Sequence, residues 1–225
     1  YTDLILVGDS LGSVLYNFKT TRDVTLDMMI EHSKSVRQGI SNSLMIVDMP
    51  FNTYKNPKQA LKNCKKVMNL TKCDGVKLEG GIKIVKIVKI LVKNKIPVMG
   101  HLGILPQSTK GKFKSKGKSS KEIKEIVRDS KLLENAGVFS IVLECVEKKL
   151  AKEITRLISI PTIGIGSSNN CDGQVLVTDD ILGLTDSKIK FVKKFSDVKK
   201  IISDGVKKFK QEVRSKKYPS KKYSY

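Results

Sequence analysis

The sequence predicts an α/β fold of the (βα)8 barrel type, with parallel strands inside and helices outside. Short apolar segments recur along the chain, and segments with helical periodicity separate them. Most of the apolar segments end in a residue that can take part in chemistry. Barrel strands are buried on both faces, and barrel active sites lie at the C-terminal ends of the strands. The 225 residues suit a single barrel domain, which commonly has about 250 residues.

Seven apolar segments are predicted as strands. They are residues 4–7, 44–47, 75–78, 98–100, 140–143, 160–166 and 174–177. The last of them is expected to end in Asp179 and Asp180. A closed barrel needs eight strands, so we expect its first strand to precede Tyr1. An open doubly wound sheet would accommodate seven, but Gly164-Ile165-Gly166 matches only part of the glycine fingerprint of that fold.

Helices are predicted between the strands from apolar residues at helical spacing. They cover residues 25–39, 57–68, 82–95, 122–136, 148–157 and 198–214. Thr25 is the candidate N-cap of the first helix, and Gly39 is its candidate C-cap. Pro57 suits a first helical turn. Gly137 is expected to end the helix before it.

Residues 105–121 form one long irregular segment, rich in lysine. Such a segment is a lid, a binding loop or a disordered insert. We favour a lid, because the segment follows a strand's C-terminal end, where barrel active sites lie. Residues 216–225 are expected to form a basic tail.

Lysine and arginine number 43 against 22 acidic residues, a formal net charge of +21. Nucleic acid or an anionic membrane surface would be the obvious partner for such a chain. The lysines are spread along the chain, however, and zinc-finger and RNP-type motifs are absent. A compositional preference for lysine explains the charge as well, so we expect no nucleic-acid or membrane partner.

The four cysteines have no CxxC spacing, and no apolar run approaches the roughly 20 residues of a membrane span. Free thiols in a reducing compartment are therefore expected, which favours the cytoplasm.

Three carboxylates end three consecutive predicted strands: Asp9, Asp48 and Glu79. Adjacent parallel strands lie about 4.8 Å apart, so these groups can converge. Converging carboxylates raise one another's pKa values, and a hard divalent cation such as Mg²⁺ would relieve that repulsion. The alternative is that each residue caps the helix or turn that follows it.

Three more residues are candidates at the same end of the strands. Lys77 shares a strand face with Glu79 and would either hold a substrate carboxylate or form a structural ion pair. Glu144 lies two strands further round the barrel and is a candidate base. His101 would donate a hydrogen bond to substrate, move a proton, or be satisfied locally.

Several stretches together resemble the ketopantoate hydroxymethyltransferase family, in the same order along the chain. They are residues 7–12 (VGDSLG), 48–51 (DMPF), 76–81 (VKLEGG), 97–103 (PVMGHLG), 143–144 (LE) and 160–177, including CDGQ at 171–174. The resemblance implies a (βα)8 barrel of the phosphoenolpyruvate/pyruvate type. It implies transfer of a one-carbon unit from 5,10-methylenetetrahydrofolate to 3-methyl-2-oxobutanoate, giving 2-dehydropantoate for pantothenate biosynthesis.

The resemblance also implies residue roles. Asp9, Asp48 and Glu79 fall where the family binds Mg²⁺. Ser10 and Lys77, with both aspartates, fall where it holds the keto acid.

Glu144 falls on the family's proton acceptor, and the family is typically a cytoplasmic homodecamer. Two departures stand out: the family's first strand and helix have no counterpart here, and Ser167-Ser168 replaces an Ala-Gly pair beside the folate pocket.

Two other functions stay open. One is another Mg²⁺-dependent 2-oxo acid lyase or aldolase on the same barrel, and the other is a basic binding protein without enzymatic activity.

Overall fold

A computed structural model describes residues 2–108 and 114–225. The chain divides into two compact units that meet at residues 175 and 176, and each is described by itself. Residues 109–113 of the predicted lid lie outside the described part of the chain.

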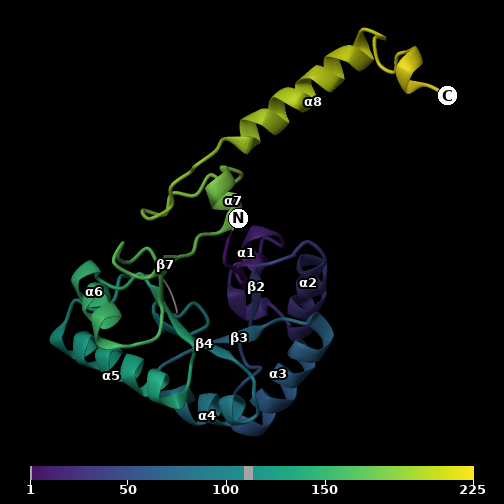
Figure 1. Ribbon diagram of the computed structural model, residues 1–225. Coiled ribbons are helices and arrows are strands. Elements are labelled where there is room, and N and C mark those ends of the chain that lie inside the picture. Colours follow the sequence, from purple (N-terminus) through teal and green to yellow (C-terminus); the bar gives the residue numbers. More distant parts are fainter. Residues whose placement is uncertain (1, 109–113) are drawn as a thin grey trace. The chain divides into compact units, whose positions relative to one another are not determined.

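The first unit is built on a parallel sheet of seven strands in the order of the chain (Figure 1). The strands are β1 (Leu4–Val7), β2 (Leu44–Asp48), β3 (Gly75–Glu79), β4 (Val98–Gly103), β5 (Ser140–Glu144), β6 (Thr162–Ile165) and β7 (Gly173–Gln174). Each strand pairs in parallel with the next. A doubly wound sheet reverses its strand order part-way, and this sheet does not. The barrel-type prediction is confirmed as a curled, partly open barrel.

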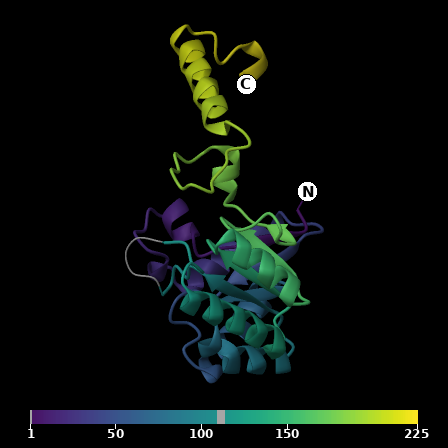
Figure 2. The same cartoon turned by 90° about the vertical axis from the view of Figure 1, so that its left-hand side faces the viewer.

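Helices connect the strands and cover the outside of the sheet (Figures 1 and 2). They are α1 (Leu11–Val14), the 3-10 helix η1 (Thr21–Asp23), α2 (Leu26–Gln38), α3 (Pro57–Thr71), the 3-10 helix η2 (Ile82–Ile84), α4 (Val85–Lys93), α5 (Ser120–Ala136) and α6 (Lys148–Leu157). The predicted caps are confirmed. The Thr25 hydroxyl accepts the N–H of Met28 at the start of α2, and Gly137 ends α5 in the left-handed region at φ +95°.

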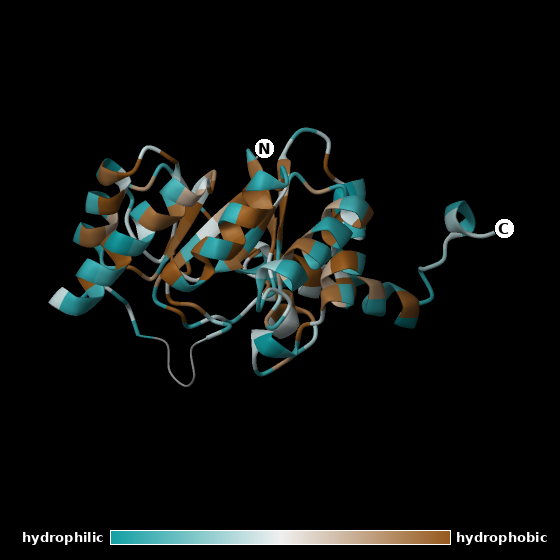
Figure 3. Ribbon diagram, turned by 90° about the horizontal axis from the view of Figure 1, so that it is seen from below, coloured by the Kyte–Doolittle hydropathy of each residue, from teal (hydrophilic) through white to brown (hydrophobic). Residues whose placement is uncertain are grey.

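The main apolar core lies between the sheet and this layer of helices, whose hydrophobic sides face the strands (Figure 3). A second, smaller cluster contains Ile46, Met99 and Val142, which come from three different strands. Side chains two residues apart on a strand point the same way. The residues two positions further on are Asp48, His101 and Glu144. The small cluster therefore forms an apolar floor beneath the polar side chains at the strand ends.

Two predicted elements differ from the structure. The helix predicted for residues 82–95 is divided into η2 and α4. The strand predicted for residues 174–177 is confined to β7, and Asp179 and Asp180 lie in the first turn of α7 (Thr178–Leu182) rather than at a strand end. Acidic side chains are favoured in the first turn of a helix because the helix dipole is positive there. The two aspartates therefore suit the start of α7.

The second unit contains α7, α8 (Val198–Arg214) and the 3-10 helix η3 (Lys221–Tyr223). Helix α8 has the predicted bounds, and none of its residues is buried. Its apolar face, which includes Ile201, Val206 and Phe209, is more than half exposed. In the described ranges, no helix is long and apolar enough to cross a membrane.

Candidate active site at the strand ends

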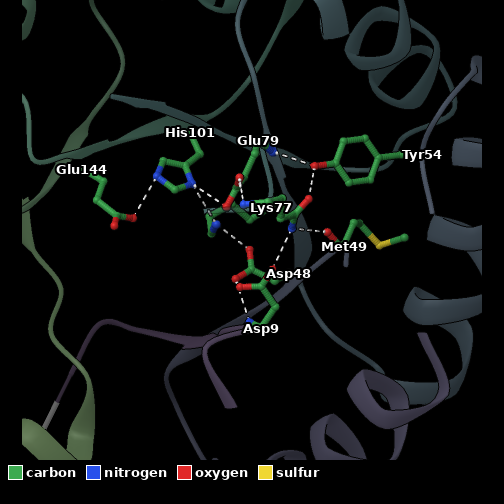
Figure 4. Close-up of polar contacts among 9 residues, drawn as sticks. Asp9, Asp48, Met49, Tyr54, Lys77, Glu79, His101 and Glu144 are labelled. Carbon is green, nitrogen blue, oxygen red and sulfur yellow. Dashed lines mark hydrogen bonds and ion pairs between the residues drawn. The ribbon is translucent and has the colours of Figure 1, made fainter. Parts of the chain in front are cut away.

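Polar side chains from five neighbouring strands meet at the carboxyl end of the sheet (Figure 4). Asp48, Glu79 and Glu144 are the last residues of β2, β3 and β5, and Asp9 follows β1 by two residues. The fifth, His101, lies within β4. The structure therefore brings together the residues that the sequence singled out at separate strand ends.

None of the three carboxylates predicted as metal ligands caps the helix that follows its strand. Ser10 is the N-cap residue of α1, Asn56 that of α3, and Gly81 that of η2. The capping interpretation of Asp9, Asp48 and Glu79 is therefore wrong. All three side chains instead lie inside the strand-end cluster.

Lys77 and Asp48 form a buried ion pair at the centre of this cluster. The Lys77 Nζ atom lies 2.6 Å from Asp48 Oδ1, and the strand register places the two residues side by side. Both side chains are buried, so this contact is shielded from water. Burial lowers the pKa of Lys77, but the charges of Asp48, Glu79 and Asp9 outweigh burial and raise it above its ordinary value.

Asp9 is held beside Asp48 by the backbone, since its N–H donates to Asp48 Oδ2 at 3.1 Å. Burial, followed by repulsion from Asp48, raises the pKa of Asp9 to about 7. Burial also raises the pKa of Asp48, although Lys77 opposes that shift. The cluster thus contains more carboxylate charge than Lys77 alone can balance.

His101 links this carboxylate cluster to Glu144. Its Nε2 atom lies 3.1 Å from Glu144 Oε2, and its Nδ1 atom lies 3.5 Å from Glu79 Oε1 and 3.2 Å from Lys77 Nζ. Burial and Lys77 would each lower the pKa of His101, but hydrogen bonds with Glu144 and Glu79 raise it to about 9. A protonated imidazole can orient Glu144 from one side and Glu79 from the other.

Ser10 lies at the N-cap position of α1, directly after Asp9. Its side chain makes no capping hydrogen bond, and its backbone carbonyl accepts the hydroxyl of Ser13. A Cβ atom on Gly8 would lie 3.1 Å from the Ser10 hydroxyl oxygen and 3.5 Å from Asp48 Oδ2. Glycine at position 8 therefore lets the Ser10 hydroxyl lie close to the backbone beside the carboxylates.

Gln107 was not expected in the site, although it belongs to the predicted lid. It is 2 % exposed. Its side chain donates to Asp9 Oδ2 and to the carbonyl of Met49, and its backbone N–H donates to Glu79 Oε2. The hydroxyl of Tyr54 donates to its Oε1. Irregular segments carry no periodicity, so no local pattern indicated that this residue would be buried.

The loop after β6 contains Ser167 and Ser168, the pair that departs from the family pattern. The Ser167 hydroxyl donates to the carbonyl of Val146, two residues beyond Glu144. Asp172 accepts the N–H and the hydroxyl of Thr162 on one oxygen, Oδ2, which ties this loop back to β6. The matched CDGQ stretch thus supports the sheet beside the site.

The donor chemistry of the cluster suits a hard divalent cation. Buried carboxylates from β1, β2 and β3 lie at one end of the sheet, and burial and mutual repulsion raise the pKa values of Asp9 and Asp48. In residues 2–108 and 114–225, no three His, Cys, Asp or Glu side chains are grouped closely enough to hold an ion. The carboxylates would therefore have to draw together around a bound ion.

Comparison with known proteins identifies the family. The profile of ketopantoate hydroxymethyltransferase matches residues 1–221. The chain belongs to this family of enzymes. A relative named 3-methyl-2-oxobutanoate hydroxymethyltransferase from Pelagibacter ubique is 64 % identical over 100 % of this chain and 87 % of its own length. One of the same name from Rhizobium etli is 46 % identical over 100 % of this chain and 84 % of its own length.

Solved structures support the fold. A crystal structure of 2,3-dimethylmalate lyase, a PEP mutase/isocitrate lyase superfamily member, matches with a TM-score of 0.57 and 11 % identity over 99 % of this chain and 76 % of that one. A putative lyase/mutase from Burkholderia cenocepacia matches with a TM-score of 0.55 and 11 % identity, over 94 % of this chain and 75 % of that one. These likenesses confirm the barrel-type fold expected from the family resemblance.

Proposed function

We propose that this enzyme transfers a hydroxymethyl group from 5,10-methylenetetrahydrofolate to 3-methyl-2-oxobutanoate, giving 2-dehydropantoate, in the first step of pantothenate biosynthesis. Family membership supports the reaction. One structural observation supports the chemistry most directly: three buried carboxylates on adjacent strands face a fourth, Glu144, through the bridging His101.

Asp9, Asp48 and Glu79 are proposed to hold Mg²⁺. Bound there, the ion would draw electrons from the carbonyl of the 2-oxo acid and make the proton at C3 easier to remove. Lys77 and the Ser10 hydroxyl are proposed to hold the carboxylate of the keto acid. Because Lys77 is fixed by Asp48, its charge would stay in one position during the reaction.

Glu144 is proposed as the base that removes the C3 proton of the keto acid. Its side chain is 20 % exposed and lies against His101, so it can reach a substrate while the imidazole fixes its orientation. His101 is also proposed to donate a hydrogen bond to the substrate. The C3 carbon of the resulting enolate then forms the new bond to the one-carbon unit. Overall, both bonds from that unit to the folate nitrogens break, water supplies the hydroxyl oxygen of the product, and tetrahydrofolate leaves carrying one proton from C3 and one from water.

Deuterium exchange at C3 of 3-methyl-2-oxobutanoate, followed by NMR, tests this proposal without the folate. We expect exchange with Mg²⁺, strong loss of exchange with a chelator, and strong loss in Glu144→Gln. Glu153→Gln is the matched control, because Glu153 is exposed on α6. Unchanged exchange in Glu144→Gln would exclude Glu144 as the base. A folded wild-type protein that neither exchanges C3 nor forms 2-dehydropantoate with the folate would disprove the proposed function.

We propose further that the enzyme acts in the cytoplasm as a homodecamer, as its family resemblance implies. Light scattering of the full chain would then give a mass ten times that of the 25.1 kDa chain. A monomer mass at micromolar concentration would contradict the proposed assembly. Cell fractionation with detection of the chain would test the compartment.

A further inference from the structure

Gln107 makes hydrogen bonds to three of the strand ends that carry the carboxylates. Its side-chain Nε2 donates to Asp9 Oδ2 at 2.8 Å, beyond β1, and to the carbonyl of Met49 at 3.0 Å, beyond β2. Its backbone N–H donates to Glu79 Oε2 at 3.1 Å, at the end of β3. One residue of the segment after β4 therefore ties together all three strands that supply the proposed metal ligands.

The orientation of the Gln107 amide is fixed by Tyr54. The Tyr54 hydroxyl donates to Gln107 Oε1 at 2.6 Å, so the amide nitrogen must point toward Asp9 and Met49. Both hydrogens of that nitrogen have acceptors within the described residues. The Tyr54 hydroxyl also accepts the N–H of Glu79 at 3.4 Å. Both the oxygen and the nitrogen of the amide therefore have hydrogen-bond partners. A side chain fixed in this way can hold the groups that it contacts in position.

Gln107 engages one oxygen of each carboxylate that it binds and leaves the other oxygen to other partners, since Oε1 of Glu79 lies 3.5 Å from His101 Nδ1. Gln107 engages Oδ2 of Asp9 and Oε2 of Glu79. The amide adds no net charge to the cluster, so it restrains the carboxylates without neutralising them. Carboxylates fixed in this way lose less side-chain freedom when they bind an ion.

We propose that Gln107 is a positioning residue for the divalent cation, because it restrains Asp9 and Glu79, two of the three proposed ligands. This inference rests on the Mg²⁺ site of the proposed function. Loss of a hydrogen-bond partner of metal ligands typically weakens metal binding about 10- to 100-fold. Gln107→Leu, which keeps most of the side-chain volume but removes the amide, should therefore weaken Mg²⁺ binding by a factor in that range.

Isothermal titration of the full-length chain with Mg²⁺, in the absence of substrate, tests this inference. The matched control is Gln59→Leu, because the Gln59 amide also bonds to backbone groups, at Asn52 and Lys55, but to no carboxylate. We expect the Mg²⁺ affinity of Gln59→Leu to stay within about twofold of the wild type, in line with additivity for separate sites.

Tyr54→Phe provides a second variant in case Gln107→Leu does not fold, which circular dichroism would show. It removes the hydroxyl that orients the Gln107 amide but keeps the ring. We expect a several-fold loss of Mg²⁺ affinity, smaller than that in Gln107→Leu. At saturating Mg²⁺, C3 exchange in both variants should approach that of the wild type, because the proposed defect lies in the affinity for the ion.

Two results would overturn the inference, and they are distinguishable from each other. If folded Gln107→Leu and Tyr54→Phe bind Mg²⁺ as tightly as the wild type or more tightly, Gln107 does not position the ligands, while the proposed function stands. If the wild-type protein itself binds no Mg²⁺ and exchanges no C3 proton, the metal site and the proposed function both fail.

Discussion

The Nζ atom of Lys77 lies 2.6 Å from Oδ1 of Asp48, and both side chains are 5 % exposed. The pair is formed by two adjacent strands whose register sets Asp48 directly beside Lys77. A charge this deeply buried requires its partner, because removing one partner leaves the other charge in a medium that solvates it poorly. Lys77 therefore contributes to the stability of the barrel through this pair, and it is also one of the residues proposed to bind the keto acid.

Lys77→Met should destabilise the protein by about 3–5 kcal/mol, since Asp48 would lose its buried counter-ion. Urea unfolding at pH 7 measures the change. Lys66→Met is the control, because Lys66 pairs with Asp27 at a similar 2.7 Å but both side chains are exposed. An exposed pair contributes about 0–1 kcal/mol. Equal losses in the two variants would show that burial of the Lys77 pair has no energetic importance.

Gly103→Ala should destabilise the first unit and displace Glu144. Gly103 has φ +101°, and an added Cβ atom would clash with the carbonyl oxygen of Glu144. The backbone at Glu144 would shift, so C3 exchange should fall together with the melting temperature.

Gly205→Ala is the matched control for Gly103→Ala. A Cβ atom at position 205 would meet nothing within 4 Å, and the residue lies inside α8. We expect α8 to gain up to about 1 kcal/mol from the better helix propensity of alanine, without loss of exchange. Normal exchange and melting in Gly103→Ala would contradict the geometry at Glu144.

The stabilisation that His101 provides should decrease as the pH rises. Its pKa in the folded state is raised to about 9, so the folded state favours the protonated form. This stabilisation is fully present below the unfolded-state pKa of about 6.5 and is lost as the pH rises through 9. The unfolding free energy of wild type minus that of His101→Gln should fall by about 3 kcal/mol between pH 6.5 and 9.5.

Urea titrations of metal-free protein in a chelator, at several pH values, measure this difference. Subtracting the variant removes the contributions of groups that titrate in both proteins, Asp9 among them. A difference that stays constant or grows with pH would show that His101 is not held in its protonated form by Glu144 and Glu79.

Asp172→Ala should cost about 1–3 kcal/mol, because it leaves the N–H and the hydroxyl of Thr162 without their shared acceptor. Thr162 is fully buried, and its hydroxyl would keep Thr155 as a partner while its N–H would lose the acceptor. Thermal unfolding measures the loss. Asp179→Ala, in the first turn of α7, serves as the comparison and should cost less than about 1 kcal/mol. Similar losses in both variants would contradict a specific role for Asp172.

The strand-end residues were predictable because a parallel barrel repeats one rule. A short apolar segment must be buried, and the first polar residue after it must lie at the carboxyl edge. Asp48, Glu79 and Glu144 follow that rule, as does Asp9 after one glycine. The same rule failed at Asp179 and Asp180, because the chain leaves the sheet after β7 and begins a helix. An apolar segment alone does not show whether a neighbouring strand is present to pair with it.

The sequence by itself determined where most strands lie along the chain, the helix caps and the identity of the carboxylates, since these depend on local patterns of residues. The tertiary structure decided the partners. His101 reaches Glu144 because β4 and β5 pair in a register that sets Gly103 beside Glu144. Gln107 reaches Asp9, which is 98 residues away in the chain. No local pattern encodes such contacts, because they exist only once the parallel strands have fixed the ends of distant segments at one edge.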